Sequence, residues 1–346
     1  MRRGLMAWDQ AEVPKSALEQ RLAVLRAVMK DEGFDALVLY TNIARGASVW
    51  WLTGFTPYWN EGLLHVPAQG EMVFATALSK RVAEWIESVM PAGRVVTTPK
   101  PAALISAGLV KDGAKRIGVL ELDDFPAGHA KIILETVPGA QLVDATFAFA
   151  RVRSGSDAVE RGLLLKADAL ARASCAAVEL STPDARAFMA PCETVARLGG
   201  AEECFALAST DLGASRAAVR TEAMGALGAT FAARISLAYK GAWTRHARSF
   251  ARDEKLQEAF DAAHARLMNF KPTDMLNLSA VLAKHFEGLG DLVDFTIEQP
   301  RGSYPLAAVA NHAGAAEGFN PAAPFVLDVE LQINGARWLG AHLVGL

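Results

Sequence analysis

The chain has 346 residues, of which 51% are hydrophobic and 21% are charged, and its formal net charge is −3. This length predicts two domains, and the composition excludes a disordered chain because enough apolar surface is available for a large core. The near-neutral charge, without a cluster of Lys and Arg, argues against a nucleic-acid partner.

Cysteine usage and hydropathy predict a cytoplasmic protein. Cys175, Cys192 and Cys204 form an odd, sparse set whose spacing fits no zinc motif, so we interpret them as small buried residues in a reducing compartment. The basic residues near Met1 are not followed by an apolar run, and no run reaches the ~18 residues that a membrane span requires. We therefore expect no membrane partner.

The first half of the chain alternates helical and extended patterns. Ser16 and Glu19 have the spacing of a capping box, and leucines then recur at helical spacing until Gly33. Residues 35–40 form a short apolar run that predicts a strand directly after this helix. Further strands are predicted at 63–66, 72–75 and 116–120, and further helices at 79–90 and 127–136. This order predicts an α/β domain.

An aromatic-rich stretch interrupts this half. Trp50, Trp51, Tyr58 and Trp59 lie close together in the sequence, and we interpret the stretch as a loop. Its aromatic side chains either line a pocket or pack the loop against its own domain. The sequence leaves both alternatives open.

The second half begins after the polar stretch 151–156, which indicates a link between two domains. Asp157 and Glu160 are predicted to cap a long helix. Residues 182–184 predict the start of the next helix, with a proline at its first position, and Gly199-Gly200 ends it. Farther along, residues 239–250 predict two strands joined by a tight glycine turn.

Several segments together carry a family resemblance. They read LEQRLAVLRAVMKDEGFDALVLY, VWWLTGF and ARVRSGSDAVERGLLLKADALA in the first half, and TFAARISLAYKGAWTRHARSF and AAPFVLDVELQI in the second. In this order and spacing, the chain resembles the creatinase, prolidase and Xaa-Pro aminopeptidase family over nearly its whole length. The resemblance implies an α/β domain at 1–152. It also implies a pita-bread domain at 153–346, which is a curved antiparallel sheet flanked by helices, and a homodimer.

The resemblance also implies two divalent ions held by two Asp, one His and two Glu. Carried over residue by residue, these positions fall at or near Arg234, Arg245, Gly290, Glu330 and Leu339, so only one expected ligand is retained. A guanidinium stays protonated, and at ~4 Å two unit charges interact by roughly 4 kcal/mol at an effective dielectric near 20. We therefore predict no metal centre and no other cofactor.

The family pocket nevertheless suggests candidate catalytic residues. Glu330 is the retained carboxylate, and His246 lies on the hairpin that lines the family's pocket. His246 should face opposite Arg245 unless a bulge intervenes. His312 lies in a stretch that precedes the strand of Glu330 and is the second acid–base candidate. His264 and His285 fall in polar helical patterns and are expected at the surface.

Further residues are predicted to bind substrate. Arg234 and Arg245 suit a carboxylate or phosphate group, and the alternative is that Arg245 and Glu330 simply fill the old cavity as an ion pair. Other candidates on the matching segments are Arg248, Trp243 and Glu298. The metal-free mechanism of creatinase does not carry over, because Ser215 or Arg216 stands where that enzyme has its histidine, although Ser209 matches a family serine.

Three functions are compatible with these residues. The one we carry forward is a metal-independent enzyme that hydrolyses a C–N bond in a small amide, amidino or amino-acid-like substrate, using Glu330 with His246 or His312. The second is an inactive family member that binds a small ligand, a peptide or a protein. The third is a metallo-aminopeptidase of the Xaa-Pro type with atypical ligands. We expect the ligand to be a small molecule or a short peptide.

Overall fold

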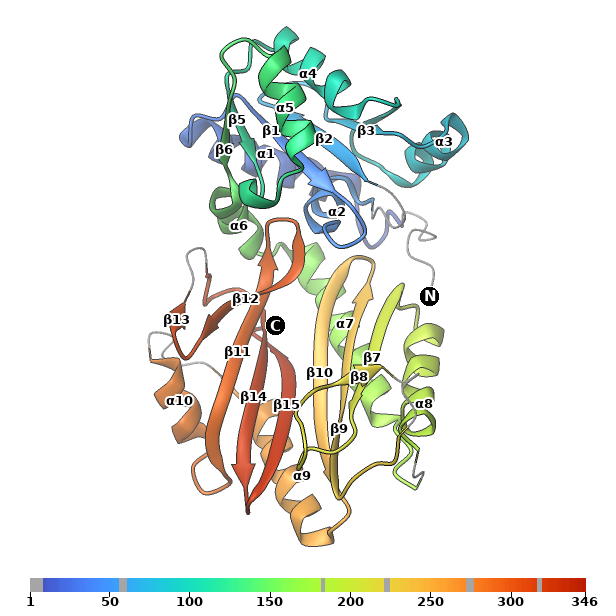
Figure 1. Ribbon diagram of the computed structural model, residues 1–346, viewed down its shortest axis with the longest axis vertical. Helices are drawn as coiled ribbons and strands as arrows, with labels where there is room; N and C mark the ends of the chain where they lie inside the picture. Colours follow the sequence, from blue (N-terminus) through green and yellow to red (C-terminus); the bar gives the residue numbers. More distant parts are fainter. Residues whose placement is uncertain (1–8, 56–60, 182–183, 221–224, 272–276, 316–318) are drawn as a thin grey trace. The chain divides into compact units, whose positions relative to one another are not determined.

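The computed structural model describes residues 9–55, 61–181, 184–220, 225–271, 277–315 and 319–346 (Figure 1). The chain divides into two compact units. The first comprises residues 2–155 together with 300–307, and the second comprises 156–299 and 308–346. The division therefore follows Gly155, a few residues beyond the predicted boundary at 152, and a hairpin tip from the second half of the chain belongs to the first unit.

The first unit is built on a mixed six-stranded sheet in the order β4-β3-β2-β1-β5-β6. Its strands are β1 (Ala36–Thr41), β2 (Gly62–Pro67), β3 (Val73–Thr76), β4 (Arg94–Thr97), β5 (Arg116–Val119) and β6 (Gln141–Asp144). Its helices are α1 (Lys15–Asp31), α2 (Ala47–Thr53), α3 (Lys80–Val89), α4 (Pro101–Lys111), α5 (Ala127–Thr136) and α6 (Thr146–Ser154). The predicted α/β alternation is thus confirmed.

Two local predictions for this unit are wrong. Helix α1 follows Pro14 directly and has no side-chain cap, so Ser16 lies inside the first turn instead of at the cap position. Trp50 and Trp51 lie in helix α2 instead of a loop, and both are buried. The buried Arg21 donates a hydrogen bond to the Trp51 carbonyl at 2.9 Å, which ties α1 to α2. Tyr58 and Trp59 lie outside the described residues.

The hairpin tip 300–307 is attached to the first unit by Glu121. The Glu121 carboxylate accepts hydrogen bonds from the Ser303 amide at 3.0 Å and from the Ser303 hydroxyl at 2.7 Å. Burial raises the pKa of Glu121, and these hydrogen bonds oppose the shift. The Arg45 guanidinium lies 5.4 Å from the centre of the Tyr304 ring, which adds a cation–π contact.

The second unit is a nine-stranded sheet in the order β13-β12-β11-β14-β15-β10-β9-β7-β8. Its strands are β7 (Glu203–Ser209), β8 (Val219–Arg220), β9 (Thr230–Tyr239), β10 (Ala242–Ala251), β11 (Asp291–Arg301), β12 (Tyr304–Asn311), β13 (Gly314–Ala315), β14 (Phe325–Ile333) and β15 (Ala336–Val344). Its helices are α7 (Ala158–Ala176), α8 (Ala185–Leu198), α9 (Glu254–Met268) and α10 (Leu278–His285). The predicted curved antiparallel sheet with flanking helices is confirmed.

Two signals in this unit form as the sequence predicts. The Asp157 side chain accepts a hydrogen bond from the Glu160 amide and so caps α7. The hairpin of β9 and β10 turns at Lys240-Gly241, where both residues have positive φ. Helix α8 begins at Ala185 with Asp184 as its cap, whereas the proline predicted at its first position lies outside the described residues.

The two faces of this sheet differ in character. Helices α7 and α9 lie behind the sheet in Figure 1 and bury its apolar face. One cluster joins α7 and α8 to β7, β9 and β10, and another joins α9 and α10 to β11, β14 and β15. Because side chains alternate along each strand, the other face receives the polar residues. No helix in the described part of the chain is long and apolar enough to cross a membrane.

Substitution of Gly118, a closely packed glycine in the first unit, tests how tightly this unit is packed. A Cβ atom at Gly118 in β5 would lie 2.4 Å from Leu37 Cδ2 and 2.9 Å from the Ala145 Cβ. Gly118→Ala is therefore expected to destabilise the protein by about 1–3 kcal/mol. Gly128→Ala in α5 is the control, because a Cβ there meets nothing within 4 Å. Urea unfolding monitored by circular dichroism should separate the two variants, and equal midpoints would contradict the packing described here.

Candidate active site

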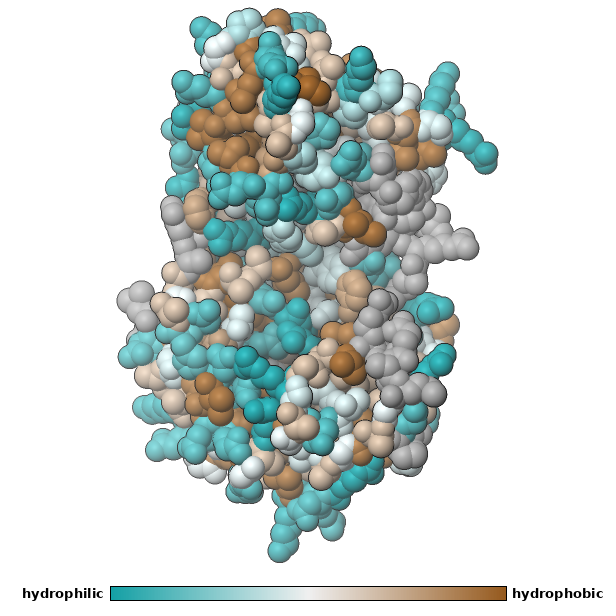
Figure 2. All heavy atoms as spheres, viewed as in Figure 1, coloured by the Kyte–Doolittle hydropathy of each residue, from teal (hydrophilic) through white to brown (hydrophobic). Residues whose placement is uncertain are grey.

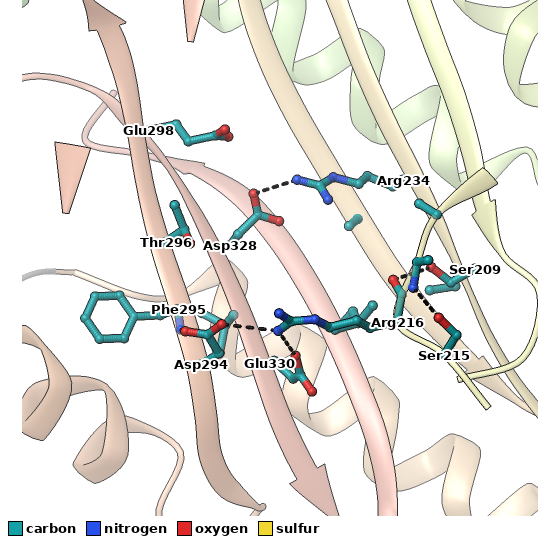
Figure 3. A pocket seen from close by; sticks show the side chains of 16 residues that line it. Ser209, Ser215, Arg216, Arg234, Asp294, Phe295, Thr296, Glu298, Asp328 and Glu330 are labelled. Atoms are coloured by element: carbon teal, nitrogen blue, oxygen red, sulfur yellow. Dashed lines mark hydrogen bonds and ion pairs between the residues drawn. The ribbon is translucent and has the colours of Figure 1, made fainter. Parts of the chain in front are cut away.

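A cavity of about 520 Å³ opens on the polar face of the nine-stranded sheet (Figure 3). Figure 2 shows hydrophilic side chains gathered over the middle of this sheet. The lining comes from strands β7, β9, β10, β11, β14 and β15 and from the segment between β7 and β8. Its polar members are Ser209, Ser215, Arg216, Arg234, Asp294, Thr296, Glu298, Asp328 and Glu330.

Strand register explains why these side chains meet. Asp294 of β11 pairs with Glu330 of β14, and Glu330 pairs in turn with Leu339 of β15. Paired residues on neighbouring strands point to the same face of a sheet. A bulge between Leu292 and Asp294 shifts the register of β11, so Leu292 faces the helices whereas Asp294 faces the pocket.

Glu330 is held by two arginines. Its side chain is only 8% exposed. Arg337 Nε lies 2.8 Å from Glu330 Oε1, and Arg216 Nη1 lies 3.0 Å from Glu330 Oε2. The same Arg216 nitrogen is 3.2 Å from Asp294 Oδ2. Each oxygen of this buried carboxylate is therefore paired with a guanidinium group.

A second group of ion pairs is centred on Arg245. Its Nη1 lies 2.8 Å from Asp328 Oδ2 and also binds Glu298, and its Nε donates to Ser236 Oγ at 3.0 Å. Arg234 Nη2 approaches the same Asp328 oxygen at 3.2 Å. Burial raises the pKa of Glu298, and the Arg245 guanidinium opposes that shift.

These charges balance one another. The carboxylates that line the pocket are Asp294, Glu298, Asp328 and Glu330. The arginines that bind them, here called the pocket arginines, are Arg216 and Arg234 in the lining and Arg245 and Arg337 beside it. With four carboxylates and four arginines, this ion-pair network offers both cationic and anionic contacts and has no net charge of its own.

The pocket residues do not fit the pair of divalent ions that the resemblance implies. Arg234 and Arg245, at the positions where the resemblance implies two aspartates, each bind a pocket carboxylate. A divalent ion here would have to displace guanidiniums that are already paired with the pocket carboxylates. Within the described ranges, no group of three or more His, Cys, Asp or Glu is arranged to hold a metal ion.

His246 and Arg248 lie on the opposite face of the sheet from the pocket, which corrects their predicted roles at the substrate. Strand β10 pairs with β9 in one unbroken register, so its side chains alternate strictly. Arg245 and Ala247 point to the pocket side, whereas His246 is buried toward the helices. Arg248 binds Asp261 of α9 at 2.8 Å.

His246 belongs to a histidine cluster under the helices. The rings of His264 and His342 lie with their centres 5.2 and 6.2 Å from that of His246. Burial lowers the pKa of His264 and His342 to about 4 and that of His246 well below its usual value. Burial also raises the pKa of Asp168, whose Oδ1 is 3.7 Å from His342 Nδ1, to about 6. The expectation that His264 lies at the surface is therefore wrong.

The other predicted residues lie at or beside the pocket. His312 is 42% exposed, and its Nε2 is 3.5 Å from Asp294 Oδ1. Glu298 lines the cavity. Trp243 lies two residues before Arg245 on β10, so it shares the pocket face of that strand. Their roles in binding or catalysis remain predictions.

Sequence reasoning missed part of the network. It assigned no role to Asp294, Asp328 or Arg337, and it noted Arg216 only as a replacement for a histidine. Asp328 and Glu330 are two residues apart and alternate with apolar residues, which is a signal for two acidic side chains on one face of a strand. The partners of these carboxylates come from distant segments, so no local pattern identifies them.

Comparisons with known proteins agree with this architecture. The Creatinase/Prolidase N-terminal domain family matches residues 21–154. No curated protein sequence matches the chain. The prolidase from Pyrococcus horikoshii OT3 is 13% identical with a TM-score of 0.69, over 94% of this chain and 98% of that one. The Xaa-Pro dipeptidase from Bacillus anthracis is 14% identical with a TM-score of 0.67, over 95% and 97%.

A structure whose name does not describe a peptidase has a similar fold. The N-terminal domain of FACT complex subunit SPT16 from Cicer arietinum is 13% identical with a TM-score of 0.63, over 95% of this chain and 93% of that one. Together these findings define the class of protein: the chain has the creatinase/prolidase fold. Residues 21–154 match the Creatinase/Prolidase N-terminal domain, and the second unit has the pita-bread fold. The family resemblance and the fold class predicted from the sequence are confirmed.

The histidine cluster makes stability depend on pH. Histidines with lowered pKa values bind fewer protons in the folded chain than in the unfolded chain, so stability falls as pH drops from about 6.5 to about 4. Asp168, with its raised pKa, makes the folded chain more stable as pH drops below about 6. This single group opposes the effect of the three histidines only in part. Arg172, Arg248 and Asp261 also face the cluster.

Urea midpoints measured from pH 7.5 to 4.5 test this expectation. His264→Gln should flatten the pH dependence because it removes a group that must be kept neutral. His129→Gln, in the other unit, is the control and should preserve the wild-type slope. A His264→Gln slope equal to that of wild type would show that the cluster does not titrate as described.

Proposed function

We propose that this protein is a metal-independent hydrolase of C–N bonds in small, amino-acid-like amides or amidino compounds, and that the cavity on the polar sheet face is its active site. One observation carries the proposal. Asp294 contacts His312 on one side and, on the other, binds Arg216, which also binds Glu330. Through Asp294 and Arg216, His312 beside the pocket is thereby connected to Glu330 in its lining, which supports a shared role for these two predicted catalytic groups.

The charge balance of the pocket supports a zwitterionic substrate. A substrate carboxylate finds guanidinium donors, and an ammonium or amidino group finds pocket carboxylates. A ligand with both charges replaces existing ion pairs without leaving a net charge in the cavity. Arg216 is the member best placed to give way, because its side chain is 61% exposed.

The geometry suggests a role for each group. Glu330 removes a proton from a water molecule, whose oxygen then attacks the carbonyl or amidino carbon. The guanidinium of Arg234 or Arg245 offsets the negative charge that develops on the substrate. Protonated His312, oriented by Asp294, donates a proton to the leaving nitrogen as the C–N bond breaks.

The proposal predicts turnover that survives chelation. Protein treated with EDTA should release amine from at least one member of a panel of N-acyl amino acids, dipeptides and creatine, followed by mass spectrometry. Glu330→Gln and His312→Gln should each lower kcat by about 10²–10⁴ with an unchanged circular dichroism spectrum. His129→Gln should leave kcat unchanged because it lies in the other unit.

Three outcomes would contradict the proposal. Turnover equal to wild type in Glu330→Gln would remove the assigned base. Activity lost on chelation and restored by Mn²⁺ would show that a metal performs the chemistry. Absence of turnover across the panel, with retained binding, would favour a ligand-binding protein that uses the same pocket.

A further inference from the structure

An aromatic pair lies on the polar face of the sheet. Phe205 of β7 and Trp243 of β10 stack with ring centres 5.9 Å apart and an interplanar angle of 19°. Phe205 remains 42% exposed, although most large apolar side chains in this unit are buried beneath the helices. We call Phe205 and Trp243 the aromatic platform. Its position on the polar face means that the hydrophobic core does not account for it.

Strand register places this platform beside the pocket. Phe205 pairs with Ser236 of β9, and Ser236 pairs with Arg245 of β10, so the three side chains share one face. Arg245 Nε donates to Ser236 Oγ at 3.0 Å, which connects this row to the pocket network. Leu207, two residues along β7 from Phe205, pairs with the pocket residue Arg234. The platform is therefore about one residue pair away from the pocket lining.

We propose that the aromatic platform is a second subsite of the active site and that it binds a planar or aromatic group of the same substrate. This inference rests on the proposed function and names its substrate class: a zwitterionic compound whose charged end binds the pocket and whose side chain carries a ring. The ring stacks against exposed Phe205, and the charged end reaches the ion pairs around Arg245.

The physical basis is the contrast between the two subsites. An aromatic ring gains both apolar burial and favourable ring geometry when it stacks on another ring. Arg245 and Glu298, next to the platform, recognise charged groups through directed hydrogen bonds. A ligand that satisfies both requires a ring separated from its charged end by only a few bonds, as in an aromatic amino acid.

Binding of 4-fluoro-L-phenylalanine to the full-length protein, followed by ¹⁹F NMR, tests the subsite. L-Phenylalanine should displace this probe at about three- to tenfold lower concentration than L-alanine, because only the former has a ring. In Phe205→Leu and Trp243→Leu, this preference should fall to near one. Leu198→Ser alters an exposed apolar residue at the end of α8 and should keep the wild-type preference.

The outcomes separate this inference from the proposed function. Equal competition by L-phenylalanine and L-alanine in the wild type, or an unchanged preference in both platform variants, overturns the subsite even if hydrolysis is observed. No detectable binding of the fluorinated probe at millimolar concentration also overturns it. A preference for L-phenylalanine over L-alanine that is lost in the platform variants supports the subsite. It does so even where Glu330→Gln has no effect on turnover.

Discussion

The ion pairs between pocket arginines and pocket carboxylates are the interaction on which this site depends. Glu330 is nearly buried, and Arg245 is only 14% exposed, so neither charge is fully solvated by water. Removing one partner of such a pair costs about 3–5 kcal/mol, because it leaves an uncompensated charge behind. The network is therefore stable only as a whole. A ligand that enters must replace each displaced arginine or carboxylate with a group of the same charge.

The nine-stranded sheet separates two environments that its sequence interleaves. Along β10, Arg245 joins the polar network whereas His246, one residue later, is buried among histidines under the helices. Alternation alone produces this division, since neighbouring side chains on a strand point to opposite faces. The pocket side accommodates charge, and the helix side keeps its histidines neutral through burial.

Much of the architecture is predictable from local signals. The cap at Asp157, the turn at Lys240-Gly241 and the alternation of helices and strands in the first half each correspond to a short pattern with a known geometry. The arginines at 234 and 245 are also recognisable, because the hairpin that carries them has few possible registers.

The remainder depends on contacts that no local pattern specifies. A bulge after Leu292 turns Asp294 toward the pocket, and a sequence gives no indication of one extra residue in a strand. Arg216 reaches Glu330 across 114 positions in the chain, and Ser303 reaches Glu121 across 182. Ser16 and Glu19 have the right spacing for a cap, but the helix begins at Lys15, so the cap position lies two residues earlier, at Pro14.

Calorimetric titration of Mn²⁺ into the chelator-treated protein tests the central claim most directly. If arginines neutralise the pocket carboxylates as described, the wild-type protein will show no saturable binding of Mn²⁺ at micromolar concentration. Saturable binding of one or two equivalents, lost when Glu330 is replaced by Gln, would contradict the account, because it would show that the carboxylates are free to gather a divalent ion.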